Sequence, residues 1–194
     1  TDAERAAVGR AADAAVRAAD AVLISDYGTG LVTPALARAV ADRVRPRGVP
    51  VLVDSRYALT KYRRLTACAP NESEVEQALG VRIDDNPRVL ERAGRRLLER
   101  TKMQAVVVTR GSRGMAVFES GRPTVHIPIF GSDQVADVTG AGDTVMAALT
   151  LTLAAGGTVE QAARLANIAG GLVVMKRGTA TVAAAELVRA IRRA

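Results

Sequence analysis

Gln104-Ala-Val-Val-Val-Thr109 is a short, continuously apolar run in which β-branched residues dominate. Such a run is typical of a strand that is buried on both faces, as in a parallel sheet covered by helices on either side. Runs of the same kind at 21–25 and 49–53 precede it in the chain, and a shorter strand is expected at 65–69. We therefore predict a mostly parallel sheet that contains the strand at 104–109.

Helical patterns alternate with these strands, which is the arrangement that produces parallel sheets in α/β proteins. A helix is expected from Pro34 to about residue 45, and two further strands at 115–119 and 124–127. We interpret residues 1–194 as a single α/β domain with strands buried between helical layers. The other helices are expected at 4–19, 72–79, 87–101, 141–155, 158–176 and 183–193.

Polar residues stand at or just after the ends of four predicted strands, namely Asp26, Asp54, Asn71 and Thr109. Ligands bind at the carboxyl ends of parallel strands, so we expect these side chains to gather around a site. For Asp26 and Asp54 the alternative is that they only end strands. Asn71 with Glu74 is also a good helix N-cap with a carboxylate at the third position, and the two roles are compatible.

The composition argues against several classes of protein. The chain has 194 residues, a net charge of +7 and only 3% aromatic residues. Its arginines are scattered and lack aromatic neighbours for base stacking, which favours a basic solvated surface over a nucleic-acid site. No apolar run reaches the length of a membrane span, and no secretory leader opens the sequence. We expect a cytoplasmic protein without nucleic-acid or membrane partners.

Two isolated residues are interpreted as structural. Cys68, the single cysteine, lies between two alanines and is expected to be a small buried apolar residue. It cannot form an internal disulfide, which fits a reducing compartment. His126, the single histidine, lies in a strand pattern without partner residues at metal-ligand spacing.

Asp137-Val-Thr-Gly-Ala-Gly-Asp143 precedes a predicted helix and carries the clearest chemistry. Small residues at a helix start leave backbone N–H groups open, and the helix dipole adds positive potential, so an anion can bind there. An aspartate at such a place is suited to accept a proton from an alcohol while a phosphoryl group arrives. The alternative is an ordinary aspartate cap after a flexible glycine turn.

This segment, continued to Thr144, resembles the C-terminal signature of the ribokinase-like (PfkB) family of sugar kinases. Pro70-Asn-Glu-Ser-Glu74 resembles the Asn-x-x-Glu motif of that family, and Val108-Thr-Arg-Gly111 its nucleotide loop at a strand end. Ser25-Asp-Tyr-Gly-Thr-Gly30 is similar to the heptose 7-phosphate kinases within the family, as are Tyr62-Arg63 and Gly178-Thr-Ala-Thr181. The resemblance implies a ribokinase-like three-layer α/β/α fold, and it covers essentially the whole chain.

The resemblance also implies roles for individual residues. Asp143 would be the general base for the sugar hydroxyl, and the backbone N–H groups of Gly140, Ala141 and Gly142 would form the anion hole. ATP and Mg²⁺ are the implied cofactors, with Glu74 acting on Mg²⁺ through water. Asp137 and Thr139 would offer oxygens to a monovalent cation such as K⁺. The nucleotide would be held by Asn71, Glu74, Thr109, Arg110, Gly111 and Asn167.

The acceptor is expected to be a sugar or sugar phosphate bound by Asp26, Asp54 and Arg56. In the heptose kinases a Pro-Lys-Gly follows the second strand aspartate, whereas Ser55-Arg56 follows Asp54 here. The charge is kept, but arginine and lysine are not interchangeable at a phosphate contact, so the sugar is less specified than the reaction. Tyr62 and Arg63 are further candidates for contacts to a phosphorylated sugar, and an exposed basic loop is the alternative for Arg56, Tyr62 and Arg63.

Kinases of this family usually begin with further strands, sugar-binding glycines and a β lid, which this sequence does not match. We therefore expect the C-terminal, catalytic part of a sugar kinase, with a sheet edge that could self-associate. A homodimer, or pairing with a separate N-terminal half, would fit this expectation. Two functional alternatives remain open: a nucleotide-binding fragment without catalysis, and a kinase of another sugar.

Overall fold

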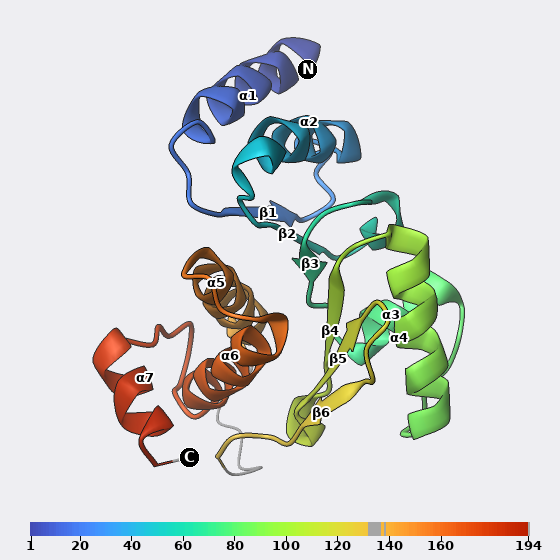
Figure 1. Ribbon diagram of the computed structural model, residues 1–194, viewed down its shortest axis with the longest axis vertical. Helices are drawn as coiled ribbons and strands as arrows, with labels where there is room; N and C mark the ends of the chain where they lie inside the picture. The colour runs from blue at the N-terminus through green and yellow to red at the C-terminus, as the bar shows by residue number, and fades with distance from the viewer. Residues whose placement is uncertain (132–136, 138, 194) are drawn as a thin grey trace.

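The computed structural model describes residues 1–131, 137 and 139–193. Its strands form one sheet in the order β1-β2-β3-β4-β5-β6, so that neighbours in sequence are neighbours in space (Figure 1). β1 to β4 are parallel, β5 is antiparallel to β4, and β6 is antiparallel to β5. This confirms the prediction of a mostly parallel sheet. The strands are β1 Val22–Asp26, β2 Val51–Ser55, β3 Ala67–Cys68, β4 Ala105–Thr109, β5 Met115–Glu119 and β6 Val125–Ile127.

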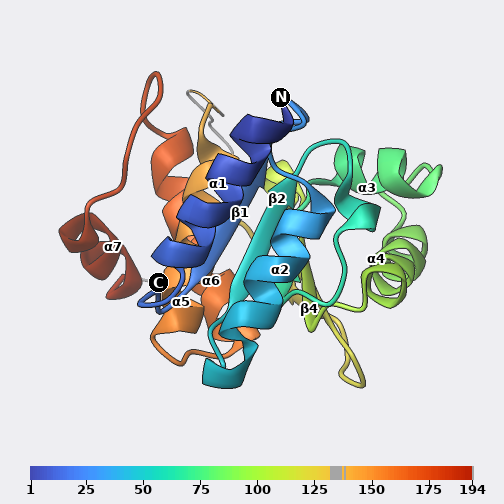
Figure 2. The same ribbon diagram turned by 90° about the horizontal axis from the view of Figure 1, so that it is seen from above.

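Helices cover both faces of the sheet, which completes the three layers (Figures 1 and 2). One face is covered by α1 Asp2–Ala15, α2 Pro34–Val44, α3 Glu72–Leu79 and α4 Pro87–Thr101. On the other face lie α5 Ala141–Ala154 and α6 Val159–Val174, with α7 Ala184–Ile191 against α6. Short 3-10 turns occur at Arg45–Arg47, Leu59–Lys61 and Gly111–Arg113.

β4 contributes to both hydrophobic cores because successive side chains of a strand point to opposite faces. Val106 and Val108 belong to the core under α2, α3 and α4. Ala105 and Val107 belong to the core under α5 and α6. All four side chains are fully buried, which explains why no polar residue stands between Gln104 and Thr109.

The turn from β4 into β5 depends on a glycine. Gly114 has φ +75°, and a Cβ at this position would collide with the backbone carbonyl of Ile127 in β6. Only a residue without a side chain can adopt this φ while β6 passes so closely. The turn reverses the chain and makes β5 antiparallel to β4.

Some boundaries differ from those expected. The second strand was predicted at 49–53 but lies at Val51–Ser55, because it begins only after Pro50, which has no N–H for the ladder. The first helix was predicted at 4–19 but begins at Asp2, where Thr1 and Glu4 form a capping box, and it ends at Ala15. Cys68 is buried as expected, and burial raises the pKa of its thiol.

None of the helices in the described part of the chain is both long and apolar enough to cross a bilayer. β1 lies at one edge of the sheet, where Leu23 is partly exposed. Self-association through this edge stays a prediction.

Replacing Gly94 with alanine should destabilise the fold, because α4 approaches the sheet closely at this glycine. A Cβ there would lie 2.6 Å from Cδ2 of the fully buried Phe118 ring. We expect Gly94→Ala to lower the free energy of unfolding by about 1–3 kcal/mol through overpacking. Gly9→Ala in α1, where a Cβ meets no atom within 4 Å, is the matched control and should stabilise by about 0.5–1 kcal/mol. Urea denaturation of both variants measures the difference, and equal effects would contradict the packing argument.

Candidate functional site

A cavity of about 680 Å³ opens where the carboxyl ends of β1 to β4 face the N-terminus of α5. The polar residues at the predicted strand ends all line it, as the rule for parallel sheets predicts. Among the residues expected at the site, Arg110 and Asp137 do not line the cavity. Those that do are Asp26, Asp54, Arg56, Asn71, Glu74, Thr109, Gly111, Thr139, Gly140, Ala141, Gly142, Asp143 and Asn167.

The N-terminus of α5 offers backbone donors to this cavity. Gly140 is the N-cap residue, has φ +77° and provides no side-chain hydrogen bond to the first turn. A Cβ on Gly142 would meet no atom within 4 Å, so the space beside the helix start is open. The N–H groups of the first helical residues are therefore available to an anionic ligand. Asp143 lies in the first turn and not at the cap, so it is not the ordinary capping aspartate of the alternative interpretation.

Tyr27 was not anticipated as a site residue, although it lies within the Asp-Tyr-Gly-Thr-Gly segment that was noticed. Its hydroxyl donates a hydrogen bond to Oδ1 of Asp143 over 3.2 Å, and it lines the cavity. The charge of Asp143 and this hydrogen bond raise the pKa of Tyr27. The only signal in the sequence was the place of Tyr27, directly after a strand end.

Four carboxylates line the cavity, those of Asp26, Asp54, Glu74 and Asp143, and two of them act on Asp54. Burial, followed by the charges of Glu74 and Asp143, raises the pKa of Asp54, and Arg56 opposes the rise. Oxygen ligands of this kind suit a hard cation such as Mg²⁺, which would relieve their repulsion. No group of three or more His, Cys, Asp or Glu residues in the described part of the chain is close enough to form a metal cage by itself. The donor set therefore fits an ion that is bound by few carboxylates together with waters and ligand phosphates.

Asn71 and Glu74 form a complete capping box at the start of α3. The side chain of Asn71 accepts from the Glu74 N–H at 2.8 Å, and Glu74 Oε2 accepts from the Asn71 N–H at 2.9 Å. The expected cap is thus confirmed, and both residues also line the cavity. Asn71 bridges to Thr109 in parallel register, which sets α3 beside the end of β4.

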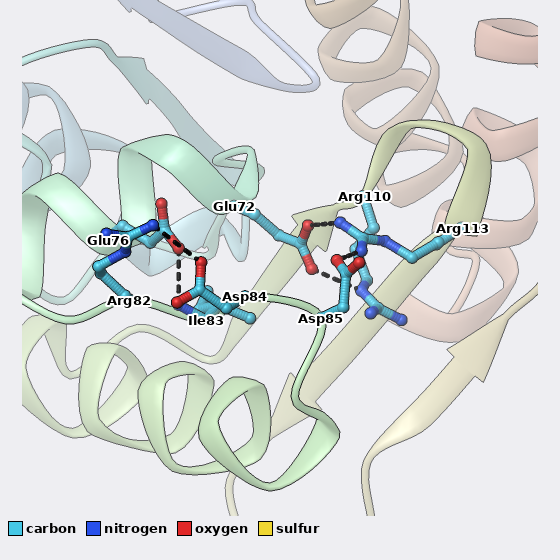
Figure 3. A network of polar contacts seen from close by, with 8 residues as sticks. All are labelled: Glu72, Glu76, Arg82, Ile83, Asp84, Asp85, Arg110 and Arg113. Carbon is cyan, nitrogen blue, oxygen red and sulfur yellow. Dashed lines mark hydrogen bonds and ion pairs between the residues drawn. The ribbon is translucent and has the colours of Figure 1, made fainter.

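Ion pairs between side chains hold the turn after β4 in place, in addition to its backbone hydrogen bonds (Figure 3). Nε of Arg110 donates to Oε1 of Glu72 at 2.8 Å, and both side chains are mostly buried. Arg113 pairs with the same carboxylate and with Asp85 (Figure 3). The guanidinium of Arg110 thus points to Glu72, while Thr109 and Gly111 on either side of it face the cavity.

The far wall of the cavity is made by α6 and is mainly apolar. Asn167 is buried, and its Nδ2 donates to the carbonyl of Pro128 at 2.8 Å. Gly170 and Gly171 follow on the same helix, and a Cβ on Gly171 would lie 3.1 Å from the Phe130 ring. The absence of a side chain here lets the chain that follows β6 pack closely against α6. Apolar residues that line the cavity are Met115, Ile129, Val145, Met146 and Val174.

Asp26 is a buried carboxylate that accepts three hydrogen bonds from the protein. Tyr62 donates at 2.7 Å, Ser55 at 2.9 Å and the Gly28 N–H at 2.9 Å. Burial acts to raise the pKa of Asp26, but these three donors together outweigh burial and lower it. The expectation that Tyr62 contacts a substrate is wrong, because its side chain is fully buried against Asp26, whereas Arg63 is exposed.

Asp137 joins the segment before α5 to the segment after α6. Its Oδ1 accepts from the Thr139 N–H at 2.9 Å, and its Oδ2 accepts from the Gly178 N–H at 3.1 Å. Hydrogen bonds from Thr139 and Gly178 lower the pKa of Asp137. The first residue of the proposed signature is thereby tied to the segment after α6, and Thr139 beside it forms part of the cavity wall.

Comparison with known protein families gives a match along nearly the whole chain. The model described as pfkB family carbohydrate kinase covers residues 2–186. The bifunctional protein HldE of Geobacter sulfurreducens is 46% identical over 170 residues, which are 86% of this chain and 34% of that protein. HldE of Klebsiella pneumoniae is 40% identical over 173 residues, 89% of this chain and 35% of that protein. The chain spans about a third of the length of these relatives.

Solved structures show the same fold. Ribokinase of Arabidopsis thaliana, complexed with ribose and ATP, superposes with a TM-score of 0.79 at 25% identity, over 93% of this chain and 58% of that chain. Phosphofructokinase-2 of Escherichia coli, in complex with potassium, gives 0.79 at 20% identity, over 95% of this chain and 61% of that one. The ribokinase-like α/β fold predicted from the sequence is therefore confirmed.

Stability should fall in acid through Asp26. Because its pKa is lower in the folded state than the unfolded value of about 3.9, its contribution is present above that value and is lost as the pH falls below about 4. We expect Asp26→Asn to lower the free energy of unfolding at pH 7 by about 2 kcal/mol. The NH2 group of asparagine is a donor, so it cannot accept the hydrogen bonds that the carboxylate oxygen of Asp26 accepts. The gap between wild type and variant should narrow below about pH 4.

Asp13→Asn is the matched control, because Asp13 pairs with Arg17 and Arg43 on the exposed surface of α1, where solvent screens the ion pairs and the loss of stability should be small. Urea unfolding from pH 7 to pH 3 measures both variants. A gap for Asp26→Asn that stays constant through this range would contradict the assignment.

Proposed function

The chain belongs to the pfkB family of carbohydrate kinases, and on this premise we propose that it binds ATP and transfers the γ-phosphoryl group to a hydroxyl of a sugar or sugar phosphate. The observation that carries the proposal is the start of α5. There, open backbone donors and the carboxylate of Asp143 face one cavity within a single helical turn. An anion site beside a carboxylate is suited to a reaction in which a phosphoryl group and an alcohol meet.

Asp143 acts as the general base in this proposal. As the acceptor oxygen forms its bond to phosphorus and the bond from phosphorus to the ADP oxygen breaks, the hydroxyl proton passes to the Asp143 carboxylate. The N–H groups of Gly140, Ala141 and Gly142 bind the phosphoryl oxygens as their charge spreads. Catalysis is then positioning together with charge stabilisation, for which the rigid helix start is suited.

The nucleotide occupies the side of the cavity between the β4 turn and α6. Thr109 and Gly111 border it, and α6 lines it with Asn167, Gly170, Gly171 and Val174, a mainly apolar wall that suits the ring of a nucleobase. Arg110 contributes by its ion pair to Glu72, which fixes the turn, and not by a direct contact. Asn71 and Glu74 line the same cavity as Asp143.

Cations complete the proposal. Glu74 and Asp54 would hold Mg²⁺, largely through water, and the ion would supply neutralisation of phosphate charge. Asp137 and Thr139 would lie next to a monovalent cation such as K⁺, which would act on the conformation of the signature loop. Support for Mg²⁺ comes from the raised pKa of Asp54, which has burial as its first cause and the nearby charges of Glu74 and Asp143 as its second.

The acceptor side is formed by Asp26, Asp54 and Arg56. Asp26 contributes indirectly, because it accepts the Gly28 N–H and so holds the loop after β1 in place. Arg56 brings a positive charge next to Asp54, which suits a phosphorylated acceptor. Heptose 7-phosphate is our proposed acceptor, because of the resemblance of residues 25–30 to heptose kinases. Another sugar of the same family is the alternative.

A second candidate function is nucleotide binding alone, with phosphoryl transfer only when further parts of a kinase are present. It is favoured by the exposure of the acceptor side, where Tyr27, Arg56 and Asp143 all face solvent. Phosphoryl transfer requires that water be kept from the reacting groups. In this case residues 1–194 bind ATP, and transfer appears when the chain is supplied with the remaining part of a complete kinase.

Gly142→Val should abolish ATP binding without unfolding the chain, since the added methyl groups fill the open space at the anion site. Ala147→Val, at an exposed position of the same helix, is the matched control and should bind ATP like the wild type. Calorimetric titration with Mg·ATP measures the affinity, and circular dichroism checks the fold. Equal affinity of Gly142→Val and wild type would contradict the assignment of the anion site.

Asp143→Asn should retain ATP binding and lose at least about a hundredfold of the transfer rate, because an amide cannot accept the hydroxyl proton. The measurement is ADP release with and without heptose 7-phosphate and a panel of sugars, after the ATP affinity has been established by calorimetry. A fully active variant would exclude Asp143 as the base. ATP binding without transfer in the wild type would support the second candidate.

A further inference from the structure

Tyr27 and its neighbour Asp26 point to opposite faces of the sheet, because side chains alternate along an extended strand. Asp26 reaches the Tyr62 hydroxyl, which belongs to the core under α2, α3 and α4. Tyr27 reaches Asp143 at the start of α5, on the other face. The buried member of the pair thus holds the end of β1 in place, and the exposed member meets the reaction site.

The loop that carries Tyr27 is fixed on both sides. Gly28 has φ +76°, and its N–H donates to Oδ1 of Asp26 at 2.9 Å. The ring of Tyr57 packs where a side chain at Gly28 would be, with Cδ2 only 2.8 Å from an added Cβ. Ser55 at the end of β2 donates to the same Asp26 carboxylate at 2.9 Å. Tyr27 is therefore presented to the cavity by a loop with little freedom to move.

The Tyr27 hydroxyl acts as a donor to Asp143, and the two residues are 116 positions apart in the chain. The charge of Asp143 and the hydrogen bond itself raise the pKa of Tyr27, so the phenol keeps its proton at neutral pH. Its ring is 57% exposed and lines the cavity, which leaves it free to touch a ligand. Any acceptor hydroxyl close enough to give its proton to Asp143 also lies next to this tyrosine.

We propose that Tyr27 is a positioning residue for the base: its hydroxyl holds one oxygen of the Asp143 carboxylate and so directs the second oxygen to the acceptor hydroxyl. The inference rests on the proposed function, since it takes Asp143 as the base. A carboxylate on an exposed side chain can rotate about its bonds, and a single donor of fixed position restricts that rotation.

The test is Tyr27→Phe, which removes the hydroxyl and keeps the ring. We expect kcat for the sugar acceptor to fall about threefold to tenfold, which is the loss of one hydrogen bond, with KM for ATP unchanged. Tyr57→Phe removes a hydroxyl from the neighbouring ring and should leave both constants unchanged. In the background of Asp143→Asn, Tyr27→Phe should have no further effect, because the two residues act through one contact.

A Tyr27→Phe enzyme with the kcat of wild type would overturn the inference, as would an equal further loss in the Asp143→Asn background. Failure of the proposed function is a different result, namely a wild type that transfers phosphate to no acceptor.

In that case the hydrogen bond between Tyr27 and Asp143 is tested directly by NMR of the tyrosine Cζ atoms. The Tyr27 signal is the one that Tyr27→Phe removes from the signals of the three tyrosines. The ionisation midpoint of Tyr27 should drop in Asp143→Asn, and an unchanged midpoint overturns the inference.

Discussion

Val106 and Val108 of β4 face one hydrophobic core and Ala105 and Val107 face the other, so this strand can lie only between two helical layers. The remaining arrangement depends on that double burial. The parallel strands β1 to β3 add on one side of β4, and their carboxyl ends meet at one edge. α5 then covers the far face and brings its N-terminus to the same edge, where the cavity forms.

The electrostatics of the cavity combine two opposed tendencies. Open N–H groups at the start of α5 attract anions, whereas Asp54, Glu74 and Asp143 repel them and one another. In the proposed function a divalent cation would resolve this conflict, because it would screen the carboxylates and add positive charge for the phosphates. A nucleotide that arrives as its metal complex would then gain more from this site than free phosphate.

The sequence predicted the features that depend on neighbours in the chain. Apolar runs indicated the strands, and the capping box at Asn71 and Glu74 was foreseen because its partners are three residues apart. The strand ends lined the cavity as expected. Features that depend on distant partners were missed: Tyr27 meets Asp143 across 116 positions, and Arg110 turns to Glu72 across 38. Tyr62 could be read as a surface contact because nothing in its neighbourhood reveals that Asp26 lies behind it.

The carboxylate of Glu72 is shared by Arg110 and Arg113, and Arg113 also reaches Asp85 (Figure 3). These four residues come from the start of α3, the loop before α4 and the turn after β4. Loss of Glu72 would leave the mostly buried guanidinium of Arg110 without its carboxylate. In evolutionary terms such positions do not drift independently: an exchange at Glu72 favours compensating exchanges at the arginines, and the four positions are expected to vary together among relatives.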